Sequence, residues 1–109
     1  MGRRRKRQMM PATAANVVKA LCADYARREH AIKFSAITGP TLARYVELNA
    51  AIVTALDGVE AGIRDELLDD IATGRGYENS KLAPLMAKNT YYERKQKVLT
   101  TIAKELWLI

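Results

Sequence analysis

Apolar residues recur at helical spacing along most of the chain, and this pattern predicts a protein built from helices. Near the N-terminus they stand at or near multiples of four, within a stretch rich in Ala, Arg and Glu. These positions are Val17, Leu21, Tyr25 and Ile32. We therefore expect a first helix from Pro11 or Thr13 to Phe34. No segment shows the sustained alternation of apolar and polar residues that marks strands, so the predicted fold class is all-α.

Two further helices are predicted in the middle of the chain. The run TGPT at residues 38–41 ends one helix and starts the next, because Pro is favoured in the first turn. The apolar face of this second helix consists of Leu42, Tyr45, Val46, Ile52, Val53 and Leu56. Asp57 and Glu60 have the spacing of a capping box, with Asp in place of Ser or Thr. A third helix then runs to Gly74, with apolar residues at steps of four: Val59, Ile63, Leu67 and Ile71.

A second interpretation joins the second and third helices into one. The apolar positions then follow a heptad pattern: Leu42, Tyr45, Asn49, Ile52, Leu56, Val59 and Ile63. Asn49 occupies an a position, where a polar residue can fix the register of a two-stranded coiled coil. Gly58 and Gly62 would each cost the joined helix about 1 kcal/mol relative to Ala. The glycines favour packing within one chain, and an intermolecular coiled coil remains the alternative.

The third helix also carries a cluster of acids, namely Asp65, Glu66, Asp69 and Asp70. The cluster lies late in the predicted helix, at the end where the macrodipole disfavours negative charge. We expect a solvated acidic face that points away from any phosphate backbone.

Residues able to catalyse a reaction or bind a metal are few. Cys22 is the only cysteine, and we interpret it as a small buried residue. His30 is the only histidine, and we interpret it as a surface residue at a helix end. The sequence offers no zinc-ligand spacing, nucleophile elbow, phosphate-binding glycine loop or paired-carboxylate site. We therefore expect no enzymatic activity, no metal and no cofactor.

The chain also lacks the features of a membrane protein. No apolar run approaches the roughly 20 residues that a membrane span requires. The segment after the basic start is too polar for the core of a signal peptide. With one cysteine and no disulfide, the expected location is the cytoplasm, without a membrane partner.

The net charge of +6 is unevenly distributed. The first ten residues contribute +5 through Arg3, Arg4, Arg5, Lys6 and Arg7. Residues 11–74 contribute −3, and residues 75–109 contribute +4. Contact of both basic ends with a polyanion would release counterions from its phosphates, which favours binding. A basic tail that serves solubility alone is the simpler alternative.

The C-terminal segment has the pattern of a helix-turn-helix unit. The run YENSKLAPLM predicts a short helix, AKN a tight connection, and the following residues a long helix that starts near Thr90. Pro84 removes a hydrogen-bond donor, so the first helix is expected either to shorten to about Tyr77–Ala83 or to begin near Ala83.

These residues carry a resemblance to known families. GRGYENSKLAPLMAKNT, residues 74–90, resembles sigma-factor region 4 in the spacing of its G-x-x-Y-E segment and its helix-starting Thr. NTYYERKQKVLTTIAKEL resembles the last helix of small phage transcriptional activators of the ArpU and RinA type. The resemblance covers about residues 65–106, and it departs from the sigma-like pattern at Ser80, Lys81 and Pro84. It implies a phage or prophage regulator of late genes that binds DNA and assists the host RNA polymerase in a bacterial cytoplasm.

A helical wheel sorts the faces of the last helix at about 100° per residue. The buried direction is defined by Val98, Leu99, Ile102 and Leu106. Tyr91 falls on this face and is expected in the core, whereas Thr90 and Glu93 have the spacing of a capping box. Lys95 also points inward. A charged side chain is tolerated there if the first turns of the helix project beyond the core, or if the side chain bends so that its ammonium reaches water.

The residues expected to contact DNA are Lys88, Asn89, Thr90, Tyr92, Arg94, Lys95 and Lys97. Arg94 is the candidate for bidentate recognition of guanine, and the lysines are expected to meet phosphates. The five cations of the tail are expected to follow the backbone or enter the adjacent minor groove. A solvated basic face is the alternative for the whole set.

The resulting hypothesis is a non-enzymatic, sequence-specific transcriptional regulator whose last helix enters the major groove of double-stranded DNA. Its expected organisation is a basic tail at 1–10, a helical scaffold at 11–74 and a DNA-binding unit at 75–109, with a single domain over 10–109 as the alternative. A homodimer could form through the second and third helices or through the C-terminal tripeptide. The alternatives in function are a small terminase-like DNA-packaging protein and a helical protein-interaction module whose acidic helix binds a partner.

Overall fold

The structure, a computed structural model, describes residues 10–109. Within this range the chain forms helices and no strand, so the all-α prediction is confirmed. The α-helices are α1 (Ala12–Ala23), α2 (Tyr25–Phe34), α3 (Gly39–Leu56), α4 (Arg64–Thr73) and α5 (Lys88–Glu105). Short 3-10 turns occur at η2 (Ala61–Ile63), η3 (Tyr77–Asn79) and η4 (Ala83–Leu85). The expected tail contacts Arg3, Arg4, Arg5, Lys6 and Arg7 lie outside the described residues.

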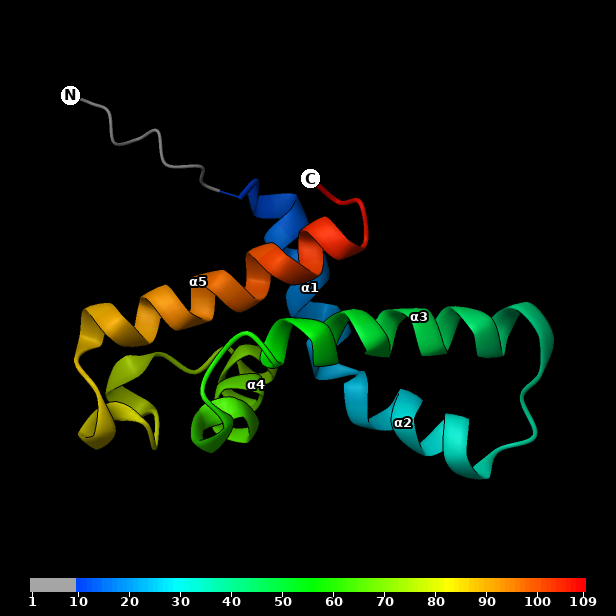
Figure 1. The fold of residues 1–109 in the computed structure, drawn as a ribbon, viewed down its shortest axis with the longest axis horizontal. Helices are drawn as coiled ribbons and strands as arrows, with labels where there is room; N and C mark the ends of the chain where they lie inside the picture. Colours follow the sequence, from blue (N-terminus) through cyan, green and yellow to red (C-terminus); the bar gives the residue numbers. More distant parts are fainter. Residues whose placement is uncertain (1–9) are drawn as a thin grey trace.

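The predicted first helix is in fact two helices, α1 and α2. The chain leaves helical geometry at Asp24, where φ is −100° and ψ is 5°, and α2 sets off at an angle to α1 (Figure 1). The Asp24 carboxylate accepts a hydrogen bond from Arg27 Nε at 2.7 Å. This contact joins two side chains, and Asp24 does not cap α2 through its side chain. The break is a change at one backbone residue, which hydrophobic spacing cannot reveal.

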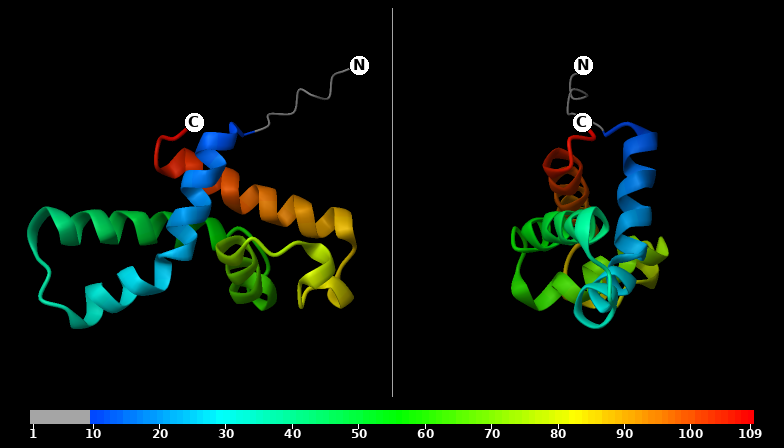
Figure 2. Two further views of the ribbon diagram at one scale, coloured as in Figure 1. Left: turned by 180° about the vertical axis from the view of Figure 1, so that it is seen from behind. Right: turned by 90° about the vertical axis from the view of Figure 1, so that its right-hand side faces the viewer.

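Helix α2 and the N-terminal part of α3 form an arm that extends away from the other helices (Figures 1 and 2). Asn49 is buried in this arm, and its Oδ1 accepts a hydrogen bond from Arg28 Nε at 2.6 Å. Arg28 is also buried and donates to the Leu21 carbonyl oxygen at 2.6 Å. Asn49 thus helps to fix how α2 lies on α3 within the chain.

The joined helix of the heptad interpretation is wrong, because α3 ends at Leu56. The chain then passes through η2, and α4 begins only at Arg64, so Asp57 and Glu60 do not form the predicted capping box. Gly58 and Gly62 lie in this connection, as their cost to a continuous helix suggests. The predicted apolar positions of the third helix, by contrast, are all buried: Val59, Ile63, Leu67 and Ile71.

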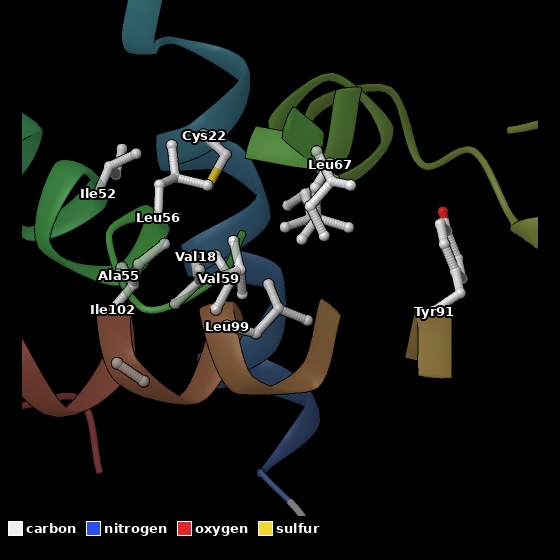
Figure 3. Packing of buried hydrophobic residues seen from close by; sticks show 14 of the residues in the cluster. Val18, Cys22, Ile52, Ala55, Leu56, Val59, Leu67, Tyr91, Leu99 and Ile102 are labelled. Carbon is white, nitrogen blue, oxygen red and sulfur yellow. The ribbon is translucent and has the colours of Figure 1, made fainter. Parts of the chain in front are cut away.

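Helix α5 packs across α3 and α1, and α1 packs on α4. One hydrophobic cluster lies between these four helices and includes Val18, Cys22, Ile52, Leu67 and Ile102 (Figure 3). It contains residues on both sides of the predicted boundary at residue 74. The buried position of Cys22 is confirmed, and so is the exposed position of His30.

The prediction for the acidic cluster is wrong in two respects. Because α4 begins at Arg64, Asp65 and Glu66 lie in its first turn, where the helix macrodipole favours negative charge. Asp70 is not solvated at all, since its exposed fraction is 0%.

The predicted first helix of the helix-turn-helix unit is also absent from residues 75–87. This segment contains only η3 and η4, so the connection from α4 to α5 is longer than the tight turn of that motif. Gly74 ends α4 in the left-handed region with φ of 77°, and Pro84 cannot donate the hydrogen bonds of a helix interior.

The chain ends beyond α5 with an exposed indole. Trp107 is 88% exposed at a φ of 61°, whereas Leu108 lies beside the first turns of α1. No helix among residues 10–109 combines the length and the apolar character that a membrane crossing requires.

Candidate nucleic-acid interface

Helix α5 runs along one edge of the molecule, and its outer side is covered by no other described element (Figures 1 and 2). Its inner side holds Tyr91, Val98, Leu99 and Ile102, all buried as predicted. The outer side carries a polar stripe of exposed residues: Asn89, Glu93, Gln96, Lys97 and Lys104. The helix is therefore fixed to the core on one side and free to contact a partner on the other.

The predicted capping box at the start of α5 is wrong. The helix begins at Lys88 with Ala87 as its N-cap residue, and no side chain caps it. Ala87 is extended, and its carbonyl oxygen accepts the hydrogen bond from the Tyr91 amide at 3.0 Å. Thr90 is consequently the third residue of the helix and is half-buried, while Glu93 stays on the exposed stripe.

A buried carboxylate holds the first turns of α5. Asp70 Oδ2 accepts hydrogen bonds from the Tyr91 hydroxyl at 2.8 Å and from the Ser80 hydroxyl at 2.5 Å. Asp70 Oδ1 accepts from Arg75 at 2.8 Å. Burial of the Tyr91 ring and the bond to Asp70 raise the pKa of that hydroxyl. The inner side of the first turns therefore packs on residues 75–82 and does not project freely.

Lys95 lies half-buried beside this network. Its ammonium donates to the Arg75 carbonyl oxygen at 2.8 Å and lies 5.3 Å from the centre of the Tyr91 ring and 5.8 Å from that of Tyr92. Burial lowers the pKa of Lys95, while the charge of Asp70 partly offsets this effect. The ammonium thus combines a backbone acceptor with cation–π contacts, an arrangement that helical spacing did not predict.

Two of the predicted DNA-contacting cations are paired with acids of the same chain. Arg94 binds Glu60 through Nε and Nη2, each at 3.0 Å from a different carboxylate oxygen. This bond lowers the pKa of Glu60 to about 2. Lys88 forms an ion pair with Glu78 at 3.0 Å. The guanidinium expected to recognise guanine is therefore occupied by a carboxylate in this structure.

The remaining predicted residues differ in how accessible they are. The Tyr92 ring is 40% exposed, and its hydroxyl accepts a hydrogen bond from the Tyr77 amide at 3.2 Å. Lys97 is exposed, and its side chain lies close to Gly58. A Cβ atom added at Gly58 would lie 3.5 Å from Lys97 Cε. Asn89 is exposed at the start of the helix.

Sequence reasoning missed three residues of this surface. Gln96 lies four residues after Tyr92 on the exposed side, so its position in the helix could have identified it. The partners Glu60 and Glu78 carried no such signal, because Glu60 is 34 residues from Arg94 in the chain. Within the described part of the chain, no group of three or more His, Cys, Asp or Glu side chains could hold a metal ion.

No family model matches the sequence, and neither a curated protein nor a solved structure matches it. The resemblance to small phage activators therefore depends on the residues of the C-terminal segment.

Proposed function

We propose that this chain is a DNA-binding regulator of transcription that places the outer side of α5 in the major groove. The observation that supports the proposal is the uncovered polar stripe of α5, which lies on a helix held rigidly by its opposite face. The major groove is about 12 Å wide and admits one α-helix. A helix at the edge of a domain can enter it without other elements striking the backbone.

The chemistry of the stripe suits direct contact with bases. The amides of Asn89 and Gln96 can each form two hydrogen bonds with adenine, and Glu93 can accept one from cytosine. Lys97 can neutralise a phosphate at the side of the groove. In this arrangement the side-chain amides of Asn89 and Gln96 contribute more to sequence recognition than Arg94 does.

Arg94 and Lys88 contact DNA only if they leave their carboxylate partners. Both ion pairs are at the surface, where such pairs contribute little to folding and exchange readily. A phosphate is a bidentate acceptor for Arg, as the Glu60 carboxylate is, so one partner can replace the other. We infer that Arg94 meets the DNA backbone, with recognition of guanine as the alternative role.

The resemblance of residues 65–106 extends the proposal to a phage or prophage regulator of late genes that acts with the host RNA polymerase. A single short helix contacts few base pairs, so the proposed regulator binds as a homodimer or together with the polymerase.

The decisive experiment selects bound fragments from total genomic DNA and then measures their affinity at several salt concentrations. We expect enrichment of one short site beside a promoter, with affinity that remains above that for random DNA as salt rises. Binding without enrichment that disappears at moderate salt would refute sequence-specific regulation and leave only charge attraction. Absence of any DNA binding would favour the protein-interaction module.

A further inference from the structure

A cleft of about 260 Å³ lies beside α5, between that helix, α1 and α4. Lys19 of α1 and Lys95 of α5 both line it, together with Tyr92, Gln96 and the backbone of Gly74. A water molecule occupies about 30 Å³ in the liquid, so the cleft has room for a small ionic group and several waters.

The charges around the cleft favour an anion. Asp70 is the only acid that lines it, and both of its carboxylate oxygens already accept hydrogen bonds from Arg75, Ser80 and Tyr91. Lys95 donates one of its three ammonium hydrogens to the Arg75 carbonyl oxygen, which leaves two for a ligand. Burial has the largest effect on the pKa of Lys95 and lowers it, Asp70 raises it, and repulsion by Lys19 lowers it to a smaller extent. An anion between the two lysines would relieve this repulsion.

The cleft also lies where a groove-bound helix meets the DNA backbone. Tyr92 and Gln96 line the cleft and belong to the exposed side of α5 as well. A helix in the major groove has a sugar–phosphate strand on each side of it. The cleft lies on one side of α5, and Arg94 leaves the helix on the other side toward Glu60.

We propose that this cleft binds one phosphate of the DNA backbone, with Lys19 and Lys95 as its cationic ligands. The inference rests on the proposed function and adds to it a contact from α1, a helix that the sequence did not connect with DNA. Lys95 then contributes to phosphate binding from a half-buried position, since the Arg75 carbonyl oxygen and the tyrosine rings hold the ammonium in place.

The test compares full-length variants in their binding to a fluorescent DNA duplex across a range of salt concentrations. Lys19→Gln removes an exposed charge, and Lys95→Met removes a half-buried charge but keeps an unbranched apolar side chain. Because the two lysines share one phosphate, each substitution should reduce the slope of log affinity against log salt concentration by up to about 0.9, the value for one phosphate contact on duplex DNA. Lys33→Gln is the matched control, because Lys33 is an exposed lysine at the end of α2, in the arm.

The outcomes separate this inference from the proposed function. If wild-type protein binds the duplex and neither Lys19→Gln nor Lys95→Met changes the slope, the cleft is not a backbone site, although DNA binding stands. An equal loss for Lys33→Gln would also overturn the inference, since the effect would then be general. A wild-type protein that binds no duplex refutes both proposals.

In a parallel experiment, inorganic phosphate is titrated into the protein while the NMR resonances of backbone amides near Lys19 and Gln96 are followed. Saturation by phosphate without duplex binding would assign the cleft to a small anion and overturn the DNA contact.

Discussion

Tyr91 and Tyr92 are neighbours in the chain with opposite environments. Tyr91 is fully buried and donates a hydrogen bond to the Asp70 carboxylate, whereas Tyr92 is 40% exposed. Removal of the Tyr91 hydroxyl leaves a buried charge with one hydrogen bond fewer, and hydrogen bonds to charged groups contribute about 1.5–3 kcal/mol. We expect Tyr91→Phe to lower the free energy of unfolding by that amount, as measured by urea denaturation.

Tyr92→Phe is the matched control for this substitution. Its hydroxyl accepts a neutral backbone hydrogen bond at the surface, so its loss should cost about 1 kcal/mol or less. Equal losses for the two variants would mean that the Asp70 network does not stabilise the start of α5.

The environment of a single residue can be predicted from the sequence in some cases and not in others, as Tyr91 and its partner Asp70 show. The inward direction of Tyr91 follows from its distance of seven residues to Val98, and the structure confirms it. The burial of Asp70 could not be predicted in this way. Its partners Ser80 and Arg75 come from an irregular segment whose path no periodic pattern describes, so an acidic side chain in a charged run appeared solvated.

Among the elements, the long periodic helices were predictable and their ends were not. The apolar spacing identified α3 and α5, although Val46 and Val53 of the face predicted for α3 are exposed. The break at Asp24 and the late start of α4 leave the spacing of apolar residues almost unchanged, so the spacing does not reveal them. The two capping boxes failed because a matching pair of residue types also occurs where the backbone is not at a helix start.

The arm offers a test of how α2 is held on α3. Asn49→Leu should destabilise the protein by about 1.5–3 kcal/mol, because Nε of the buried Arg28 guanidinium then loses its acceptor. The double variant Arg28→Met with Asn49→Leu removes both polar partners and should recover much of this loss, since apolar replacement of a buried polar pair is often nearly neutral. Urea denaturation of the three proteins measures the coupling. A double variant less stable than Asn49→Leu would contradict this explanation.

The connection between α3 and α4 restrains Arg94 of α5 through Glu60. In Glu60→Gln the guanidinium loses its carboxylate partner, and we expect affinity for duplex DNA to rise several-fold. The control is Glu105→Gln, which removes an exposed acid from the last turn of α5 and should have a smaller effect. Unchanged affinity in Glu60→Gln would show that Arg94 does not contact DNA.

The pH dependence of this restraint follows from the pKa of Glu60. Because Arg94 lowers that pKa from 4.5 to about 2, the ion pair is fully present above the ordinary value and is lost only as pH falls toward 2. The advantage of Glu60→Gln over wild type should therefore stay constant from pH 5 to 8. An advantage that disappears within this range would point to another titrating group.

At the scale of the whole molecule, the net charge is concentrated at one end of the sequence. Residues 10–109 carry thirteen Lys and Arg against twelve Asp and Glu, so nearly all of the net +6 resides in the first nine residues. Many of the thirteen are already paired with acids on the protein surface, as Arg94 and Lys88 are. The composition alone disclosed the basic tail, whereas the pairing of the other cations depends on contacts between distant segments. General attraction to DNA and recognition by α5 should therefore be separable.

Removal of residues 1–9 tests this separation. Up to five cations are lost, and each phosphate contact that disappears reduces the slope of log affinity against log salt by about 0.9. We expect the truncated chain to bind all sequences more weakly and with a much smaller salt dependence, while the ratio of affinities for the selected site and for random DNA is preserved. Fluorescence anisotropy with both duplexes across a range of salt concentrations measures the salt dependence and the ratio of affinities.

The control is a full-length chain in which Arg3, Arg4, Arg5, Lys6 and Arg7 are replaced by Gln. This variant keeps the length of the chain, and its DNA binding should match that of the truncated chain. If the truncation abolishes the preference for the selected site, recognition lies in the tail and the outer side of α5 is not the reading surface.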